Sequence, residues 1–202
     1  RGDVLLPETS LARGAPMTTA AFFGLRLASD RVLFVVDRSG SMERIIGTGG
    51  QSRYEEAVDQ IFYFLAQAGS DASFALALFH DNAETWRTGR LMESSDSVLK
   101  QARRWLEAKR PKGGTNLRTG LFNALGGDRR GQVKADHLDV DTVVVLCDGA
   151  TASGAGWVQD WIEATQEDLQ LIIHGVQIGS HGDGTLEALA EGTGGKFIRV
   201  DG

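Results

Sequence analysis

The chain has 202 residues, of which 42% are hydrophobic and 24% are charged, and its formal net charge is −6. This composition can bury the core of one ordinary domain and is not that of a disordered chain. The negative charge argues against a nucleic-acid partner, because modules that bind nucleic acids tend to carry a basic face. The apolar runs are shorter than the roughly 18 residues of a membrane-spanning helix, so we expect no membrane insertion.

Cys147 is the single cysteine, which excludes a disulfide within the chain. It ends an apolar run, and we interpret it as a small core residue rather than a nucleophile. The chain opens with Arg1 instead of methionine, so we expect a piece of a longer protein. The sequence therefore does not indicate the compartment or establish the oligomeric state. Our expectation for the oligomeric state is a monomeric domain.

The first residues, 1–20, show no steady hydrophobic period and are interrupted by proline and glycine, which predicts an extended arm on the surface. Residues 21–202 are expected to form one domain. Within it, residues 23–27 alternate between large apolar and smaller or polar side chains, which suggests an edge strand. Residues 31–36 follow as an apolar, β-branched run that is typical of a fully buried strand.

Later elements follow from hydrophobic period and turn signals. We expect one helix after a Ser-Arg-Tyr-Glu capping box at 52–55 and further helices around 98–106, 117–125, 157–162 and 186–189. We expect strands at 72–79, 84–90, 142–146, 169–178 and 197–200. Long loops are expected at 42–51 and 126–140. Strands alternate with helices, and the central strands are apolar on both faces. This pattern predicts an α/β fold, doubly wound, with a mainly parallel central sheet and helices on both faces.

Oxygen-bearing side chains follow the buried strands. Asp37, Ser39 and Ser41 come after the strand at 31–36, Asp148 comes after 142–146, and Thr115 opens a helix between them. Ligands of open α/β sheets collect at the carboxyl ends of the strands, so we expect these loops to meet at one edge. Two carboxylates and three hydroxyls suit Mg²⁺, and Mn²⁺ is acceptable to the same ligands. An open coordination position would accept an Asp or Glu of another molecule.

Residues 37–41, Asp-Arg-Ser-Gly-Ser, resemble the D-x-S-x-S signature of the metal-ion-dependent adhesion site (MIDAS) of von Willebrand factor A domains. Thr115 and Asp148 match the family's distant threonine and second aspartate, in the same order. The resemblance spans roughly residues 22–200 and implies a Rossmann-like fold. It also implies that the serines ligate the metal directly, that the threonine joins them in the high-affinity state, and that the aspartates often act through water.

Four neighbouring residues are assigned to a rim that would contact the partner: Arg38, Gly114, Asn116 and Gly149. Arg38 inside the motif is also compatible with a solvated surface arginine. Asn116 is also a plausible N-cap of the next helix. The loops at 42–51 and 126–140 either shape partner choice or are simply long solvated loops.

The function that we expect from the resemblance is a metal-dependent protein-binding module, not an enzyme, that grips an acidic residue of a partner in adhesion or assembly. One alternative is a structural or assembly domain in which the metal mainly orders loops. Another is a phosphoryl-transfer enzyme with Asp37 as nucleophile, but that chemistry normally needs a second aspartate two residues later, where Ser39 stands. Zinc is not expected, because no His or Cys pair has ligand spacing.

Overall fold

The computed structural model describes residues 21–27, 29–127, 133 and 139–201, so the predicted arm at 1–20 and most of the predicted loop at 126–140 lie outside the described residues. Its strands are β1 (Ala21–Phe22), β2 (Leu25–Arg26), β3 (Arg31–Asp37), β4 (Ser73–Phe79), β5 (Ala83–Thr85), β6 (Met92–Glu93), β7 (Thr142–Cys147), β8 (Ile172–Ile178) and β9 (Phe197–Val200). Its α-helices are α1 (Arg53–Ala68), α2 (Asp96–Glu107), α3 (Leu117–Ala124), α4 (Val158–Leu169) and α5 (Thr185–Gly192), and two 3₁₀ turns are η1 (Gly40–Glu43) and η2 (Trp86–Gly89).

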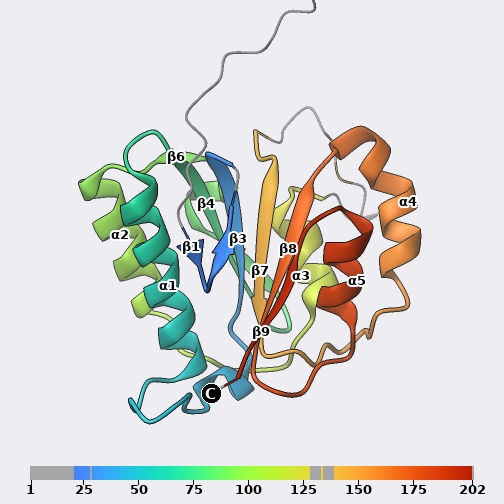
Figure 1. Cartoon of the computed structure of the whole chain (residues 1–202), viewed down its shortest axis with the longest axis horizontal. Helices are drawn as coiled ribbons and strands as arrows, with labels where there is room; N and C mark the ends of the chain where they lie inside the picture. The colour runs from blue at the N-terminus through green and yellow to red at the C-terminus, as the bar shows by residue number, and fades with distance from the viewer. Residues whose placement is uncertain (1–20, 28, 128–132, 134–138, 202) are drawn as a thin grey trace, which may run out of the picture.

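A twisted central sheet runs through the molecule in the order β5-β4-β3-β7-β8-β9, and β6 pairs with β4 beside β5. The neighbours β4, β3, β7, β8 and β9 are all parallel, whereas β5 and β6 are antiparallel to β4. Helices α1 and α2 lie on one side of the sheet, and α4 and α5 lie on the other (Figure 1). The predicted doubly wound, mainly parallel α/β fold is therefore confirmed.

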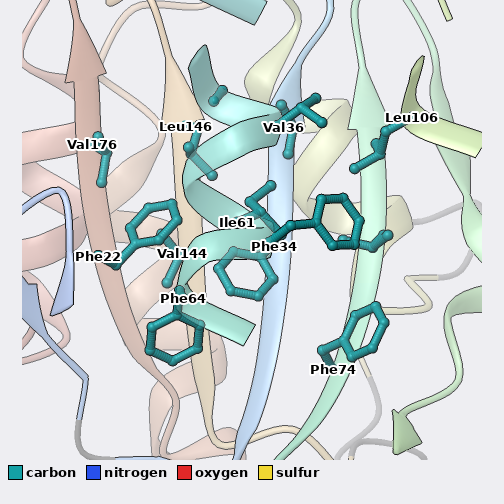
Figure 2. Close-up of a cluster of buried hydrophobic side chains, with 14 of the residues drawn as sticks. Phe22, Phe34, Val36, Ile61, Phe64, Phe74, Leu106, Val144, Leu146 and Val176 are labelled. Atoms are coloured by element: carbon teal, nitrogen blue, oxygen red, sulfur yellow. The ribbon is translucent and has the colours of Figure 1, made fainter. Parts of the chain in front are cut away.

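The alternation of side chains along β3 divides the core into two layers. Val32, Phe34 and Val36 pack with α1 and α2, while Leu33 and Val35 pack with the helices of the opposite face. Figure 2 shows the first layer, in which aromatic and aliphatic side chains fill the space between α1 and the strands. Because residues at even and odd positions of a strand point to opposite faces, every central strand must be apolar on both sides.

Residues 23–27 do not form the predicted edge strand of the main sheet. β1 and β2 instead pair with each other as a separate antiparallel hairpin. Phe23 and Gly24 have φ values of 48° and 81°, so the chain reverses there instead of continuing as a strand. Phe22 is fully buried and packs against Phe34 and Phe64, which makes the hairpin a cover for the first core layer.

Two other predicted strands have the wrong length. The strand predicted at 84–90 ends at Thr85, because Trp86 turns inward and stacks on Phe74 with ring centroids 5.9 Å apart. The strand predicted at 169–178 begins at Ile172, since Leu169 completes α4 and Gln170 closes that helix in a left-handed conformation. Among the described residues, no helix has the length and the apolar character needed to cross a bilayer.

The predicted capping box at the start of α1 is confirmed. Ser52 is the N-cap: its backbone N–H donates to Glu55 Oε2 at 2.8 Å, and its hydroxyl accepts from the Glu55 N–H at 3.2 Å. Both bonds satisfy donors that a helix N-terminus leaves free. They also fix Arg53 as the first helical residue, directly beside the carboxyl edge of the sheet.

Gly120 lets α3 lie directly on β4. A Cβ at this position would lie 2.5 Å from Phe79 Cβ. We therefore expect Gly120→Ala to lower the free energy of unfolding by about 1–3 kcal/mol, as overpacking does elsewhere, in a denaturant titration. Gly156→Ala is the matched control, because a Cβ there would meet no atom within 4 Å. Equal losses in the two variants would contradict this view of the α3 contact.

Candidate metal centre

Three loops meet at the carboxyl edge of the parallel strands, as the sequence predicts. The loop after β3 is joined to the loop before α3 by a bond from the Gly40 N–H to the Gly113 carbonyl, 3.1 Å long. The loop after β7 is joined to the same segment by a bond of 2.8 Å from the Ala152 N–H to the Thr115 carbonyl. In Figure 1 this edge is at the bottom.

Asp37 ends β3 with a carboxylate that is fully buried, at 0% exposure. Its Oδ1 accepts a hydrogen bond from the Ser39 N–H at 2.7 Å, and its Oδ2 accepts one from the Cys147 thiol at 3.1 Å. The hydroxyl oxygens of Ser39 and Ser41 lie 3.0 Å apart. The motif after β3 thus folds back on itself and gathers carboxylate and hydroxyl oxygens in one small volume.

Asp148, directly after β7, is also buried. Its Oδ2 forms an ion pair of 2.9 Å with Arg53 Nη1, and the two side chains are 7% and 15% exposed. Single ligand atoms of Asp37, Asp148 and Cys147 all lie within 4.8 Å of one another. The second predicted aspartate is therefore next to the first, and a cation of the protein itself lies beside it.

These residues fit a hard divalent cation. Burial raises the pKa of Asp37 to about 6, although the bonds from Ser39 and Cys147 lower it, and the charge of Asp148 adds to the rise. Burial beside the two carboxylates also raises the pKa of the Cys147 thiol, so the thiol is neutral and acts as a donor rather than as a metal ligand. Two buried carboxylates and the nearby hydroxyl oxygens are ligand types that suit a hard divalent cation, and such an ion would offset the charge that the single guanidinium of Arg53 leaves.

Thr115 and its neighbours are held in the middle loop by backbone contacts. Gly114 is exposed, and its N–H donates to Asp81 Oδ1 at 3.0 Å. A Cβ on Gly114 would lie 2.7 Å from that same oxygen, so the loop passes close to the Asp81 carboxylate. Asn116 caps α3 by accepting from the Thr119 N–H at 3.1 Å, as the alternative interpretation of Asn116 predicts. Thr115 itself is half-buried between these anchors.

Arg38 and Gly149 are buried, so the structure does not place them on an exposed rim. Arg38 is only 8% exposed, and its Nη1 donates to the Arg110 carbonyl at 3.3 Å. Its backbone N–H continues the β3 ladder by donating to Phe79, so its side chain follows Val36 toward α1 and α2. Gly149 is buried, because the loop after β8 covers it so closely that a side chain would collide with His181.

Sequence reasoning missed three contributors to this centre. Arg53 forms an ion pair with the predicted ligand Asp148, and no feature of the sequence singled it out. Cys147 was predicted as a core residue, which its burial confirms, but its bond to Asp37 was not foreseen. Asp81 shapes the middle loop. Strand alternation alone places Cys147 on the same face as Asp37, whereas the approach of Arg53 depends on how α1 packs.

The buried charge of Asp37 predicts how pH acts on the metal-free protein. Its pKa is about 6 in the folded chain and 3.8 ordinarily. Because the folded state holds the Asp37 proton more tightly than the unfolded state, protonation stabilises the fold at low pH. This stabilisation is fully present below about pH 4 and is lost as the pH rises through 6. In EDTA, we expect the free energy of unfolding of the wild type to fall relative to that of Asp37→Asn by about 2 kcal/mol from pH 4 to 7. If the free energies of unfolding of the two proteins changed with pH by the same amount, this prediction would be contradicted.

Comparison with known proteins identifies the family to which the chain belongs. A family model described as the von Willebrand factor type A domain matches residues 30–197. The inter-alpha-trypsin inhibitor heavy chain H2 of Mus musculus is 28% identical over 127 residues, which are 61% of this chain and 12% of that protein. The chain thus matches only a small part of that relative.

Solved structures with the same fold are more distant in sequence. The conserved hypothetical protein BatB from Bacteroides thetaiotaomicron has a TM-score of 0.62 at 18% identity, over 84% of this chain and 89% of that one. Proximal thread matrix protein 1 of the mussel byssus, in a structure with a zinc-occupied MIDAS motif, has a TM-score of 0.55 at 19% identity, over 84% and 41%. With the family model matching most of its length, the chain belongs to the von Willebrand factor type A domain family.

Proposed function

We propose that this domain is a metal-dependent protein-binding module that grips an acidic residue of a partner through a Mg²⁺ or Mn²⁺ ion. One observation carries the proposal: single ligand atoms of Asp37, at the end of β3, and of Asp148, directly after β7, lie within 4.8 Å of each other, and the Asp37 carboxylate accepts a hydrogen bond from the loop that holds the Ser39 and Ser41 hydroxyls. Von Willebrand factor A domains are commonly protein-interaction modules, which supports a binding role.

In this proposal, Ser39, Ser41 and Thr115 ligate the ion through their hydroxyls, and Asp37 and Asp148 act directly or through water. The ion supplies a positive charge that attracts a carboxylate, and the hydroxyl ligands are neutral, so they do not cancel that charge. The exposed backbone at Gly114 and the half-buried Asn116 border the site on the side of the middle loop. Of the four residues predicted to contact the partner, Gly114 and Asn116 are the two that are not buried.

Magnesium or manganese is proposed over zinc because the available ligand atoms are oxygens. The Cys147 sulfur is near, but its bond to Asp37 and its raised pKa keep the proton on it. The zinc in the mussel protein shows that the family's site can take that ion in another chain. A competition between Mg²⁺ and Zn²⁺ in solution therefore belongs in the same series of measurements.

The first test asks whether these oxygens bind the ion. A dication that binds only the folded state raises stability by RT ln(1 + [M]/Kd), about 2.7 kcal/mol at a hundred times Kd. We expect Mg²⁺ or Mn²⁺ to raise the melting temperature of the wild type and to leave that of the Ser39→Ala/Ser41→Ala variant unchanged. Ser153→Ala, an exposed serine in the loop after β7, is the control that keeps the rise. An equal rise in the double variant would contradict the ligand assignment.

The second test asks whether the ion binds a partner's carboxylate. Peptides with a central Asp or Glu and matched peptides with Asn or Gln are titrated in Mg²⁺ and in EDTA. We expect selective binding of acidic peptides in Mg²⁺, and its loss both in EDTA and in Asp37→Ala. Binding that persists in Asp37→Ala would overturn the proposal.

The alternatives predict other outcomes in the same tests. If the metal mainly orders loops in a structural or assembly domain, EDTA lowers the melting temperature but leaves peptide binding intact. Asp37 as a phosphoryl-transfer nucleophile would release product from an aryl phosphate. We propose a binding role instead, because Ser39 occupies the place of the second aspartate that such chemistry needs and its N–H already holds the Asp37 carboxylate.

A further inference from the structure

Arg53 brings a positive charge to the metal centre from outside the motif. Its guanidinium Nη1 lies 2.9 Å from Asp148 Oδ2, and both side chains are largely buried. The residue is the first of α1 and follows the Ser52 capping box, so its backbone is fixed at the edge of the sheet. The pair therefore joins helix α1 to the loop after β7 at the candidate ligand itself.

The guanidinium has a close-fitting place. A Cβ on Gly179, the residue after β8, would lie 2.7 Å from Arg53 Nη2 and 2.9 Å from its Cζ. Gly179 has a φ of 125°, a conformation that favours glycine, so the guanidinium lies directly against bare backbone there. The other side of Arg53 opens into a surface pocket of about 580 Å³, which Arg199 also lines. Arg53 is thus largely buried between Asp148 and the Gly179 backbone, while Arg199 is exposed in the same pocket.

The net charge of the centre follows from three ionisable side chains. Asp37 and Asp148 are the two carboxylates of the buried cluster, and Arg53 is paired with one of them. The centre therefore carries one net negative charge when both carboxylates are ionised, and a dication converts this to one net positive charge. With a neutral residue in place of Arg53, the loaded centre would be neutral and would attract an anion less strongly.

We propose that Arg53 is a positioning residue that sets the charge of this centre: it weakens the hold on the divalent ion and keeps the loaded site positive for a partner carboxylate. The inference rests on the proposed function and deepens it. It also has a clear rival. If Arg53 only oriented Asp148, its loss would weaken metal binding, as the loss of groups that orient metal ligands typically does. The two roles thus predict opposite changes in metal affinity when Arg53 is replaced by a neutral residue.

The experiment measures both affinities in the folded domain at neutral pH. Mn²⁺ binding is followed by electron paramagnetic resonance, and acetate, the simplest carboxylate probe, is titrated into the Mn²⁺-loaded protein while water-proton relaxation is recorded. We expect Arg53→Gln to bind Mn²⁺ about tenfold more tightly, the order of size for a unit charge in a partly exposed site, and to bind acetate several-fold more weakly. Arg53→Lys, which keeps the charge, should restore both affinities.

Arg199→Gln is the matched control, because it removes a positive charge from the same pocket without touching Asp148. Its affinities for Mn²⁺ and acetate should stay close to those of the wild type. Arg53→Met is the second neutral variant, with circular dichroism to check folding, in case Arg53→Gln does not fold. Weaker or unchanged Mn²⁺ binding in the neutral variants would overturn the inference alone. A wild type that binds no Mn²⁺ would overturn the proposed function with it.

Discussion

The carboxylate of Asp37, buried at the end of β3, is the constraint on which the rest of this site depends. Removing an ionised group from water is costly unless hydrogen bonds and opposite charge replace the solvent. The fold supplies donors from Ser39 and Cys147, yet the pKa of Asp37 still rises to about 6. Asp148 adds a second buried carboxylate, and Arg53 is paired with only that one. The loops therefore form a centre with one net negative charge when both carboxylates are ionised, and a bound dication would offset it.

Strand alternation decides which side chains share this centre. Asp37 and Cys147 continue the faces of β3 and β7 that pack on α3 and α4, so the thiol comes to lie against the carboxylate. Arg38 falls on the opposite face, where it enters the layer beneath α1 and α2. The N-terminus of α1 is on that side too, and from there Arg53 reaches Asp148. The arginine of the motif thus has a packing role, and the arginine of the helix has the electrostatic one.

Much of this arrangement could be predicted from sequence because it follows from local patterns. Apolar runs located the central strands, and the rule that parallel strands end at one edge predicted the meeting of the loops after β3 and β7. The burial of Arg38 was also within reach, since the even positions of β3 all face α1. Arg53, the cover over Gly149 and the β1–β2 hairpin were not, because each depends on a contact between segments that only the packed fold brings together.

The central claim is that these buried oxygens form a binding site for a divalent ion. Diffraction from crystals soaked in Mn²⁺, recorded where manganese scatters anomalously, tests it most directly. We predict one strong anomalous peak at the carboxyl edge of the sheet, between Asp37 and Asp148 and within ligand distance of the Ser39 and Ser41 hydroxyls. A well-ordered centre without a peak, or a peak held by other residues, would contradict the account.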